Sequence, residues 1–188
     1  MTKRDAVCEA ALELFAEKGI QATTTREIAE RAGAAEGTLY RHFDGKDDLA
    51  NWLHQRCADE LRDRLAAAAD EAAAPAERLE ALVRGIFAFF AEKPTSCTYL
   101  LSRQDESTDG ADPEGSRAPL APFTDTIEAG MEAGAFEDVS APLVAGWILS
   151  MVQRTVLFLK ADALPMGRAA AIDRTVAAAR RLVEAGRT

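Results

Sequence analysis

Apolar residues recur every three or four positions along most of the chain, whereas no convincing run of alternating apolar and polar residues predicts a strand. This periodicity indicates an all-α protein of about nine helices. The first helix is expected over residues 3–17, where one apolar stripe consists of Val7, Ala11, Leu14 and Phe15. Lys18 and Gly19 should end this helix.

Residues 24–46 predict two short helices at a steep angle, joined by a tight turn. Thr24 and Glu27 have the spacing of a capping box, so the first of these helices should begin there. Gly33 should end it, because glycine adopts positive φ without a steric cost.

The second of these helices carries Leu39 and Phe43, which lie four residues apart and should face the core. A helix-turn-helix depends on a small residue, a turn residue and a locking residue, which are here Ala29, Gly33 and Leu39. Two ordinary amphipathic helices of an all-α core are the alternative interpretation of the same spacing.

The outer face of the second helix is polar, and its groups can donate to phosphates or reach base edges. Its residues are Glu36, Gly37, Thr38, Tyr40, Arg41 and His42. The glycine leaves room for the close approach of a phosphate backbone. This face therefore favours DNA binding over simple core packing.

Five short segments strengthen this interpretation. They are Thr25-Arg26-Glu27-Ile28-Ala29, Ala32-Gly33, Gly37-Thr38-Leu39-Tyr40, His42-Phe43 and Lys46-Asp47-Asp48-Leu49. Together they resemble the N-terminal signature of the TetR family of one-component transcriptional repressors, over residues 3–50. One departure is Ala35, where many members have a serine that caps the recognition helix. Alanine is a poor cap and costs roughly 0.5–2 kcal/mol.

The resemblance implies a DNA-binding surface in the first 46 residues. The residues expected on it are Thr24, Thr25, Arg26, Glu36, Gly37, Thr38, Tyr40, Arg41, His42 and Lys46. Within this set, we expect Thr38, Tyr40 and Lys46 to contact phosphates.

Arg26, Glu36 and Arg41 are the best candidates for base reading, because arginine pairs with guanine and glutamate accepts from cytosine. Glu36 is the weakest of the three, since an acid beside DNA repels phosphates. Lys3 and Arg4, at the start of the chain, suit phosphate or minor-groove contact, and a solvated N-terminus explains them equally well.

The remainder of the chain predicts further helices around a core. They are expected over residues 46–71, 75–93, 96–104, 119–133, 140–163 and 168–185. Residues 105–119 hold almost nothing apolar and are expected to form a mobile loop. The chain therefore divides into a DNA-binding domain of residues 1–46 and a helical ligand-binding and dimerisation domain of residues 47–188.

The helix at 140–163 is the most apolar in the sequence, and a helix that is apolar nearly all round is buried on both sides. We expect its second side to meet another copy of the chain, together with the helix at 168–185. The residues assigned to this homodimer interface are Ile148, Thr155, Leu159 and Val176. A dimer also fits operator DNA, because two recognition helices can read half-sites roughly 34–36 Å apart.

A ligand site is expected between the helices at 75–93, 96–104 and 140–163, because apolar pockets between bundle helices commonly hold small molecules. Its candidate residues are Phe87, Phe90, Tyr99, Trp147, Met151 and Arg154. Core packing explains the aromatic residues equally well. Arg154 lies in the most apolar helix and needs a partner, which is an acid such as Glu128 or Glu132, an acid across the dimer, or an anionic ligand.

Composition narrows the function further. The formal charge of −9 argues against a protein that coats nucleic acid non-specifically, and residues 1–46 carry only −1 of it. Cys8, Cys57 and Cys97 fit neither a disulfide framework nor a zinc spacing, and two histidines are too few for a metal cluster. We expect no metal, no cofactor and no enzyme activity. With no leader and no apolar run long enough for a bilayer, a cytoplasmic protein is expected.

The expected function is that of a ligand-responsive, sequence-specific regulator that binds double-stranded operator DNA. Repression, and release by a lipophilic small molecule, are implied by the resemblance and not by the residues alone. Two alternatives stay open at this point. One is a redox-sensing repressor that acts through Cys57 or Cys97 without an effector, and the other is a helical protein–protein adaptor.

Overall fold

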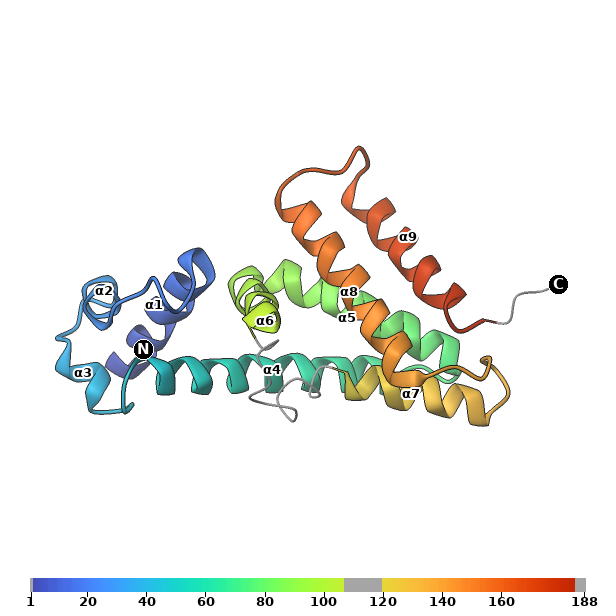
Figure 1. Cartoon of the computed structure of the whole chain (residues 1–188), viewed down its shortest axis with the longest axis horizontal. Helices are drawn as coiled ribbons and strands as arrows, with labels where there is room; N and C mark the ends of the chain where they lie inside the picture. The colour runs from blue at the N-terminus through green and yellow to red at the C-terminus, as the bar shows by residue number, and fades with distance from the viewer. Residues whose placement is uncertain (1, 107–119, 185–188) are drawn as a thin grey trace. The chain divides into compact units, whose positions relative to one another are not determined.

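The computed structural model describes residues 2–106 and 120–184, and within them the chain forms nine helices and no strand (Figure 1). The helices are α1 (Lys3–Lys18), α2 (Thr25–Arg31), α3 (Gly37–Tyr40), α4 (Lys46–Asp70), α5 (Pro75–Glu92), α6 (Pro94–Glu106), α7 (Ala121–Glu132), α8 (Ala141–Lys160) and α9 (Arg168–Arg181). The all-α prediction is thus confirmed. The predicted loop at 105–119 falls almost entirely outside the described residues.

The chain divides into two compact units. Unit 1 comprises Met1–Asp59 and Lys93–Asp109, and unit 2 comprises Glu60–Glu92 and Gly110–Thr188. This division differs from the boundary expected after residue 46, because the first part of α4 and all of α6 belong with the N-terminal helices. No local sequence signal marks the change, since α4 continues as one helix from one unit into the other.

Unit 1 is built on α1, which packs against α2, α3 and α6. The predicted apolar stripe of α1 is buried, including Leu14 and Phe15. Tyr99 of α6 stacks on Phe15 with ring centroids 5.9 Å apart, and its hydroxyl donates to the backbone oxygen of Ala50 at 2.7 Å. Tyr99 is fully buried there, so α6 completes the core of this unit.

Capping boxes begin α1 and α2, and a glycine turn follows α2. Thr24 and Glu27 form the predicted capping box: the Thr24 N–H donates to Glu27 Oε2 at 2.8 Å, and the Glu27 N–H donates to Thr24 Oγ1 at 3.2 Å. Thr2 and Asp5 form a second capping box at α1. Gly33 has φ +60°, which confirms the predicted turn residue.

Unit 2 is a bundle in which α5 packs against α7, α8 and α9. The predicted apolar face of α5 is buried, with Leu79, Leu82 and Phe89 at its centre. Near the end of α7, the ring of Phe136 lies over Gly130, where any side chain would collide with it. Among the described helices, α8 alone combines the length and hydropathy that a membrane span requires, a property that core helices share.

Candidate nucleic-acid interface

The recognition helix α3 is short and weakly stabilised by its own residues. It spans four residues, and its N-cap Glu36 makes no side-chain hydrogen bond to the helix. The cap position is therefore Glu36, one residue after the Ala35 that the sequence predicts as the cap. Because so short a helix is not stable on its own, its orientation depends on contacts from the rest of unit 1.

A polar bridge joins α2 to α3. Thr25 Oγ1 donates to Glu36 Oε1 at 2.6 Å, and the hydroxyl of Tyr40 donates to Thr25 Oγ1 at 3.5 Å. The carboxylate of Glu36 is therefore engaged within the motif. Tyr40 is 55% exposed, so more than half of its surface faces solvent.

Lys46 anchors the start of α4. Its Nζ donates to the backbone oxygen of Thr23 at 2.8 Å, and the hydroxyl of Thr23 donates to the oxygen of Gly19 at 2.8 Å. This chain of bonds holds α4 to the loop between α1 and α2. An ammonium group has three donors, so Lys46 keeps two for a phosphate.

The predicted DNA-contact residues differ in exposure. Those that are exposed are Thr24, Arg26, Glu36, Gly37, Tyr40, Arg41 and His42, and those that are half-buried are Thr25 and Lys46. Thr38 is a correction to the prediction: it is only 5% exposed, because α3 turns it inward beside the buried Leu39. Its side chain offers little surface to DNA.

Gly37 has no packing reason to be glycine. A Cβ atom added at this position would meet nothing within 4 Å, and the residue lies in a helix, where glycine costs about 1 kcal/mol relative to alanine. Open space beside a helical glycine agrees with the predicted close approach of an outside group.

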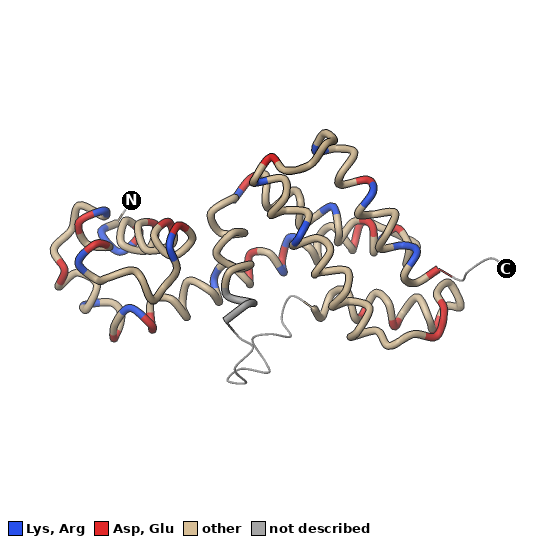
Figure 2. Tube along the Cα trace, turned by 45° about the horizontal axis from the view of Figure 1, so that its top comes forward, with Lys and Arg blue, Asp and Glu red and all other residues tan. Residues whose placement is uncertain are grey.

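Most charges near this surface are paired within unit 1, where Lys and Arg alternate with Asp and Glu (Figure 2). Arg31 pairs with Glu17 at 2.9 Å and with Glu13 at 3.6 Å, and Arg26 pairs with Glu30 at 2.9 Å. These pairs neutralise the acids that would otherwise repel DNA.

Lys18 pairs with Glu27 at 2.6 Å and joins α1 to the capping box of α2. The Lys18 ammonium, followed by the N–H and hydroxyl of Thr24, lowers the pKa of Glu27 to about 2. In contrast, Arg41 is exposed and makes no ion pair with another described residue, so its charge is available to DNA.

The predicted ligand residues are divided between the two units. The structure corrects the placement of Tyr99 with the other ligand candidates, because Tyr99 lies in the core of unit 1. Phe87 and Phe90 are buried on α5, and the guanidinium of Arg168 lies 5.7 Å from the centre of the Phe90 ring. On α8, by contrast, Trp147 is 50% exposed.

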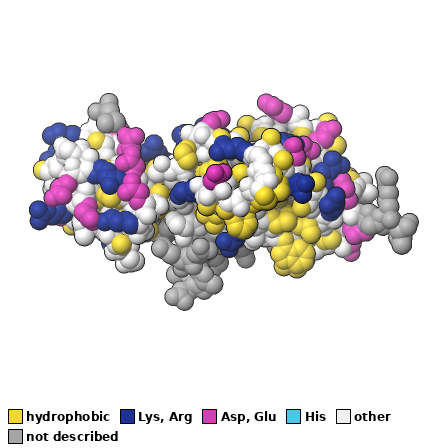
Figure 3. Space-filling model, turned by 90° about the horizontal axis from the view of Figure 1, so that it is seen from above, with side chains coloured by type: hydrophobic (Ala, Val, Ile, Leu, Met, Phe, Trp, Pro, Cys, Tyr) yellow, Lys and Arg dark blue, Asp and Glu magenta, His cyan; other side chains and the backbone are white. Residues whose placement is uncertain are grey.

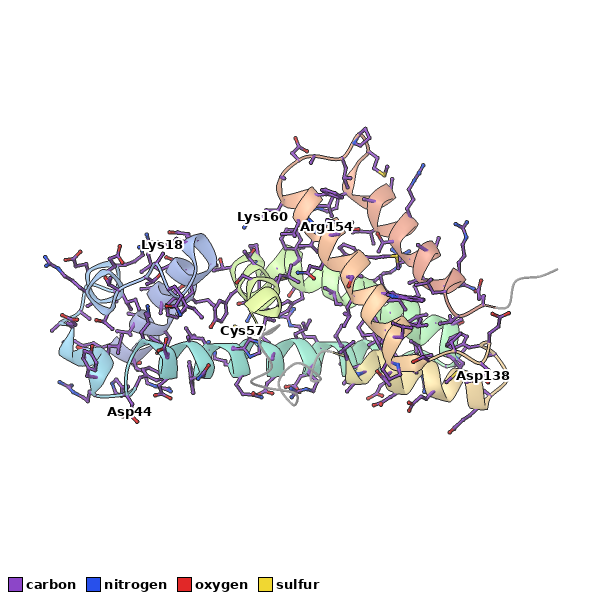
Figure 4. All side chains as sticks on the ribbon, in the orientation of Figure 1. Lys18, Asp44, Cys57, Asp138, Arg154 and Lys160 are labelled. Carbon is purple, nitrogen blue, oxygen red and sulfur yellow. The ribbon has the colours of Figure 1, made fainter. Side chains whose placement is uncertain are left out.

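The other two ligand candidates lie on the same side of α8 as Trp147. Met151 is half-buried, and Arg154 is exposed on α8 (Figure 4). Arg154 forms no ion pair with Glu128, Glu132 or any other described acid. The predicted partner within the protomer is therefore absent among the described residues.

The predicted dimer residues mostly face the core of unit 2. Ile148 is fully buried and Val176 is 5% exposed, while Thr155 Oγ1 lies 3.2 Å from Thr175 Oγ1 in a hydrogen bond between α8 and α9. Leu159 is half-buried. This corrects the assignment of Ile148 and Val176, since a side chain buried in its own protomer cannot also contact a partner.

The opposite side of α8 carries the exposed apolar residues. They are Leu143, Trp147 and Phe158, which are 41–50% exposed. Figure 3 shows hydrophobic side chains gathered on one face of the molecule. Within the protomer, the side of α8 that was expected to meet another copy is thus buried, and the side that carries Trp147 is exposed.

The three cysteines, Cys8, Cys57 and Cys97, are buried, which disfavours the redox-sensing alternative without testing it. Burial raises the pKa of Cys97 to about 12 and also raises the pKa of Cys8, so these thiols stay protonated at neutral pH. Within the described part of the chain, no group of His, Cys, Asp and Glu side chains is arranged to hold a metal.

Comparison with known proteins covers both units. Residues 7–52 match the sequence model of bacterial regulatory proteins of the tetR family. The repressor KstR2 of Mycobacterium tuberculosis is 38% identical over 86 residues, which are 46% of this chain and 43% of that protein. The chain thus matches less than half the length of this curated relative.

Solved structures extend the likeness to the whole chain. A tetR-family regulatory protein from Rhodococcus RHA1 is 26% identical, with a TM-score of 0.82 over 99% of each chain. The regulator FadR from Bacillus subtilis, in complex with stearoyl-CoA, shares the fold at 20% identity, with a TM-score of 0.78 over 94% of this chain and 97% of that one. Residues 7–52 therefore carry the sequence signature of the tetR family, and the chain shares its fold with solved tetR-family regulators.

Proposed function

We propose that this chain is a dimeric, sequence-specific DNA-binding repressor that leaves its operator when a lipophilic small molecule binds. The observation that carries this proposal is the α2–α3 pair, which presents exposed Tyr40 and Arg41 beside the open space at Gly37. Donors and an unobstructed backbone on one face suit a phosphate chain and the base edges beside it.

The DNA contacts divide by the chemistry of each side chain. Lys46 donates to a phosphate, and Tyr40 does so when its long 3.5 Å bond to Thr25 is exchanged for one to the phosphate. The single hydroxyl proton of Thr25 stays with Glu36, whereas Arg26 and Arg41 reach base edges. Glu36 acts within the protein, because its carboxylate accepts the Thr25 hydroxyl and so places both Thr25 and Tyr40.

The homodimer forms through the exposed side of α8 together with α9. Leu143, Trp147 and Phe158 supply the apolar contact. These side chains are exposed in a single protomer, and a dimer would remove them from water. Two recognition helices related by a two-fold axis then read two half-sites, each of which is too short to define an operator by itself.

The effector is lipophilic and binds in unit 2. Support comes from two relatives: one is described as a ketosteroid transcriptional regulator, and the other was crystallised with stearoyl-CoA. In this chain, α5 supplies the apolar aromatic side chains Phe87 and Phe90, with the cationic Arg168 beside them. Release follows by linkage, since a ligand that prefers one arrangement of the dimer lowers the population of the other.

Selection of duplexes from a random pool, followed by fluorescence anisotropy, tests the proposal. We expect a two-fold-related sequence that binds at least about a thousandfold more tightly than scrambled DNA. Stearoyl-CoA and a ketosteroid are then titrated into the complex, and one of them should release the duplex. A protein that enriches no sequence would refute the regulator, and the adaptor would then be the better explanation.

A further inference from the structure

Arg4 lies against two aromatic rings in unit 1. Its guanidinium carbon is 4.4 Å from the centre of the Trp52 ring and 5.4 Å from the centre of the Phe43 ring. The two rings are themselves 5.6 Å apart and tilted by 57°. One side chain in the first turn of α1 thus contacts both α4 and the segment that follows α3.

Arg4 forms no salt bridge with an acid among the described residues, and its charge acts on the adjacent Asp5 only at longer range. The adjacent Asp5 is occupied by Thr2, whose backbone N–H donates to it at 2.8 Å. A second guanidinium, that of Arg56, lies 5.4 Å from the centre of the Trp52 ring. Contact with ring faces is therefore the interaction that holds the half-buried Arg4 in place.

Phe43 transmits this contact to the recognition helix. It is buried, follows the last residue of α3 by three positions, and donates its backbone N–H to the oxygen of Leu39 at 3.0 Å. The Thr25–Glu36–Tyr40 bridge fixes α3 from the side of α2, whereas Phe43 fixes its C-terminal end. Without a side-chain cap of its own, α3 takes its orientation from these two contacts together with its packing on α1.

We infer that Arg4 is a positioning residue for DNA recognition: its guanidinium holds Phe43 and Trp52 together, and so sets the angle at which α3 meets DNA. Arg4 does not neutralise a phosphate. This inference rests on the proposed DNA-binding function and assigns Arg4 a different role from the phosphate or minor-groove contact that its place in the sequence suits.

The two roles have different salt dependences. A side chain that neutralises one phosphate contributes about 0.9 to the slope of log affinity against log salt concentration. A positioning residue changes the affinity and leaves that slope unchanged, because the number of released counterions stays the same. The slope therefore distinguishes the two roles even when a substitution of Arg4 weakens DNA binding in either case.

The test uses the full chain and the duplex that the wild-type protein selects, with anisotropy titrations at several salt concentrations. Arg4→Gln should lower affinity about tenfold at every salt concentration, with the wild-type slope. Arg4→Lys should recover only part of this loss, because an ammonium lacks the planar group that stacks on an indole. Lys3→Gln is the comparison for loss of charge alone: Lys3 is exposed one position earlier, and the rings of Phe43 and Trp52 are contacted by Arg4 and Arg56 instead. Any phosphate contact at this end of α1 would appear as a smaller salt slope in that variant.

A double-mutant cycle with Trp52→Leu links the effect to the ring. Arg4→Gln should cause little further loss of affinity in the Trp52→Leu protein, because the contact is already gone. Trp52 and Trp147 are the two tryptophans of the chain, so in a Trp147→Phe background the emission reports Trp52 alone. Arg4→Gln should shift that emission without DNA, while circular dichroism confirms that the variants are folded.

Three results would overturn the assignment. A slope reduced by about one in Arg4→Gln, with full recovery in Arg4→Lys, would make Arg4 a phosphate contact. If Arg4→Gln lowered the affinity equally in the wild-type and Trp52→Leu proteins, Arg4 would not act through the Trp52 ring. Wild-type affinity in Arg4→Gln would leave it without a role in binding. If the wild-type protein selects no duplex, the proposed function fails first and this inference fails with it.

Discussion

At the scale of single residues, Glu36 is the side chain whose role changes most once its contacts are known. As a base reader, it would leave Thr25 on binding DNA, whereas as a positioning acid it keeps the 2.6 Å bond. We expect Glu36→Gln to select the same sequence as the wild-type protein, because an amide oxygen still accepts from Thr25. Glu36→Ala should bind that sequence several-fold more weakly.

Selection from a random pool, followed by titration of the two variants, checks this prediction. Glu9→Gln serves as the control for removing one exposed negative charge from unit 1. If Glu36→Gln prefers a different base at one position of each half-site, Glu36 reads that base and the positioning role is wrong.

Glu27 makes the stability of α2 depend on pH. Its folded-state pKa of about 2 lies below its ordinary value of 4.5, so its stabilising contribution is fully present above pH 4.5 and is lost as the pH falls towards 2. The wild-type protein should therefore melt at a higher temperature than Glu27→Gln at pH 6, and the gap should narrow between pH 4.5 and pH 2. Circular dichroism during thermal unfolding measures the difference in melting temperature between the two proteins. A difference that does not change with pH would contradict the lowered pKa of Glu27.

At the scale of elements, the two sides of α8 differ in exposure, and we expect substitutions on them to have different effects. Trp147→Asp should yield a folded monomer that no longer binds the operator, because the charge lies on the exposed apolar side. Ile148→Ala should instead leave the dimer intact and lower the free energy of unfolding by about 2–5 kcal/mol, since it empties a core position.

Sedimentation and thermal unfolding distinguish the two outcomes for these neighbouring residues. A dimeric Trp147→Asp protein at micromolar concentration would place the interface elsewhere. A monomeric Ile148→Ala protein of unchanged stability would restore the original assignment of that residue.

At the scale of the whole molecule, the effector should couple stability to DNA release. A ligand at a hundred times its dissociation constant stabilises the folded state by about 2.7 kcal/mol, which for a chain of this size raises the melting temperature by about 5–10 °C. We expect stearoyl-CoA or a ketosteroid to produce this rise and to release the selected duplex over the same concentration range. A compound that stabilises the protein and leaves the complex intact would refute the linkage.

The DNA-binding part was largely predictable because its signals are local. The capping box of Thr24 and Glu27, the turn at Gly33 and the inward Leu39 depend on residues within one or two helical turns. The same reasoning failed for Thr38, because a four-residue helix has too few positions to show which way each side chain turns.

The sequence by itself determined the helices, their caps and the helix-turn-helix, since periodicity and backbone hydrogen bonding act over a few residues. Only the tertiary structure decided that Tyr99 completes unit 1 and that Ile148 faces inward while Trp147 faces outward. A helix that is apolar on both sides presents two equivalent faces in the sequence. Which of them enters the core depends on the shape of the bundle around it, and that shape is assembled from residues far apart in the chain.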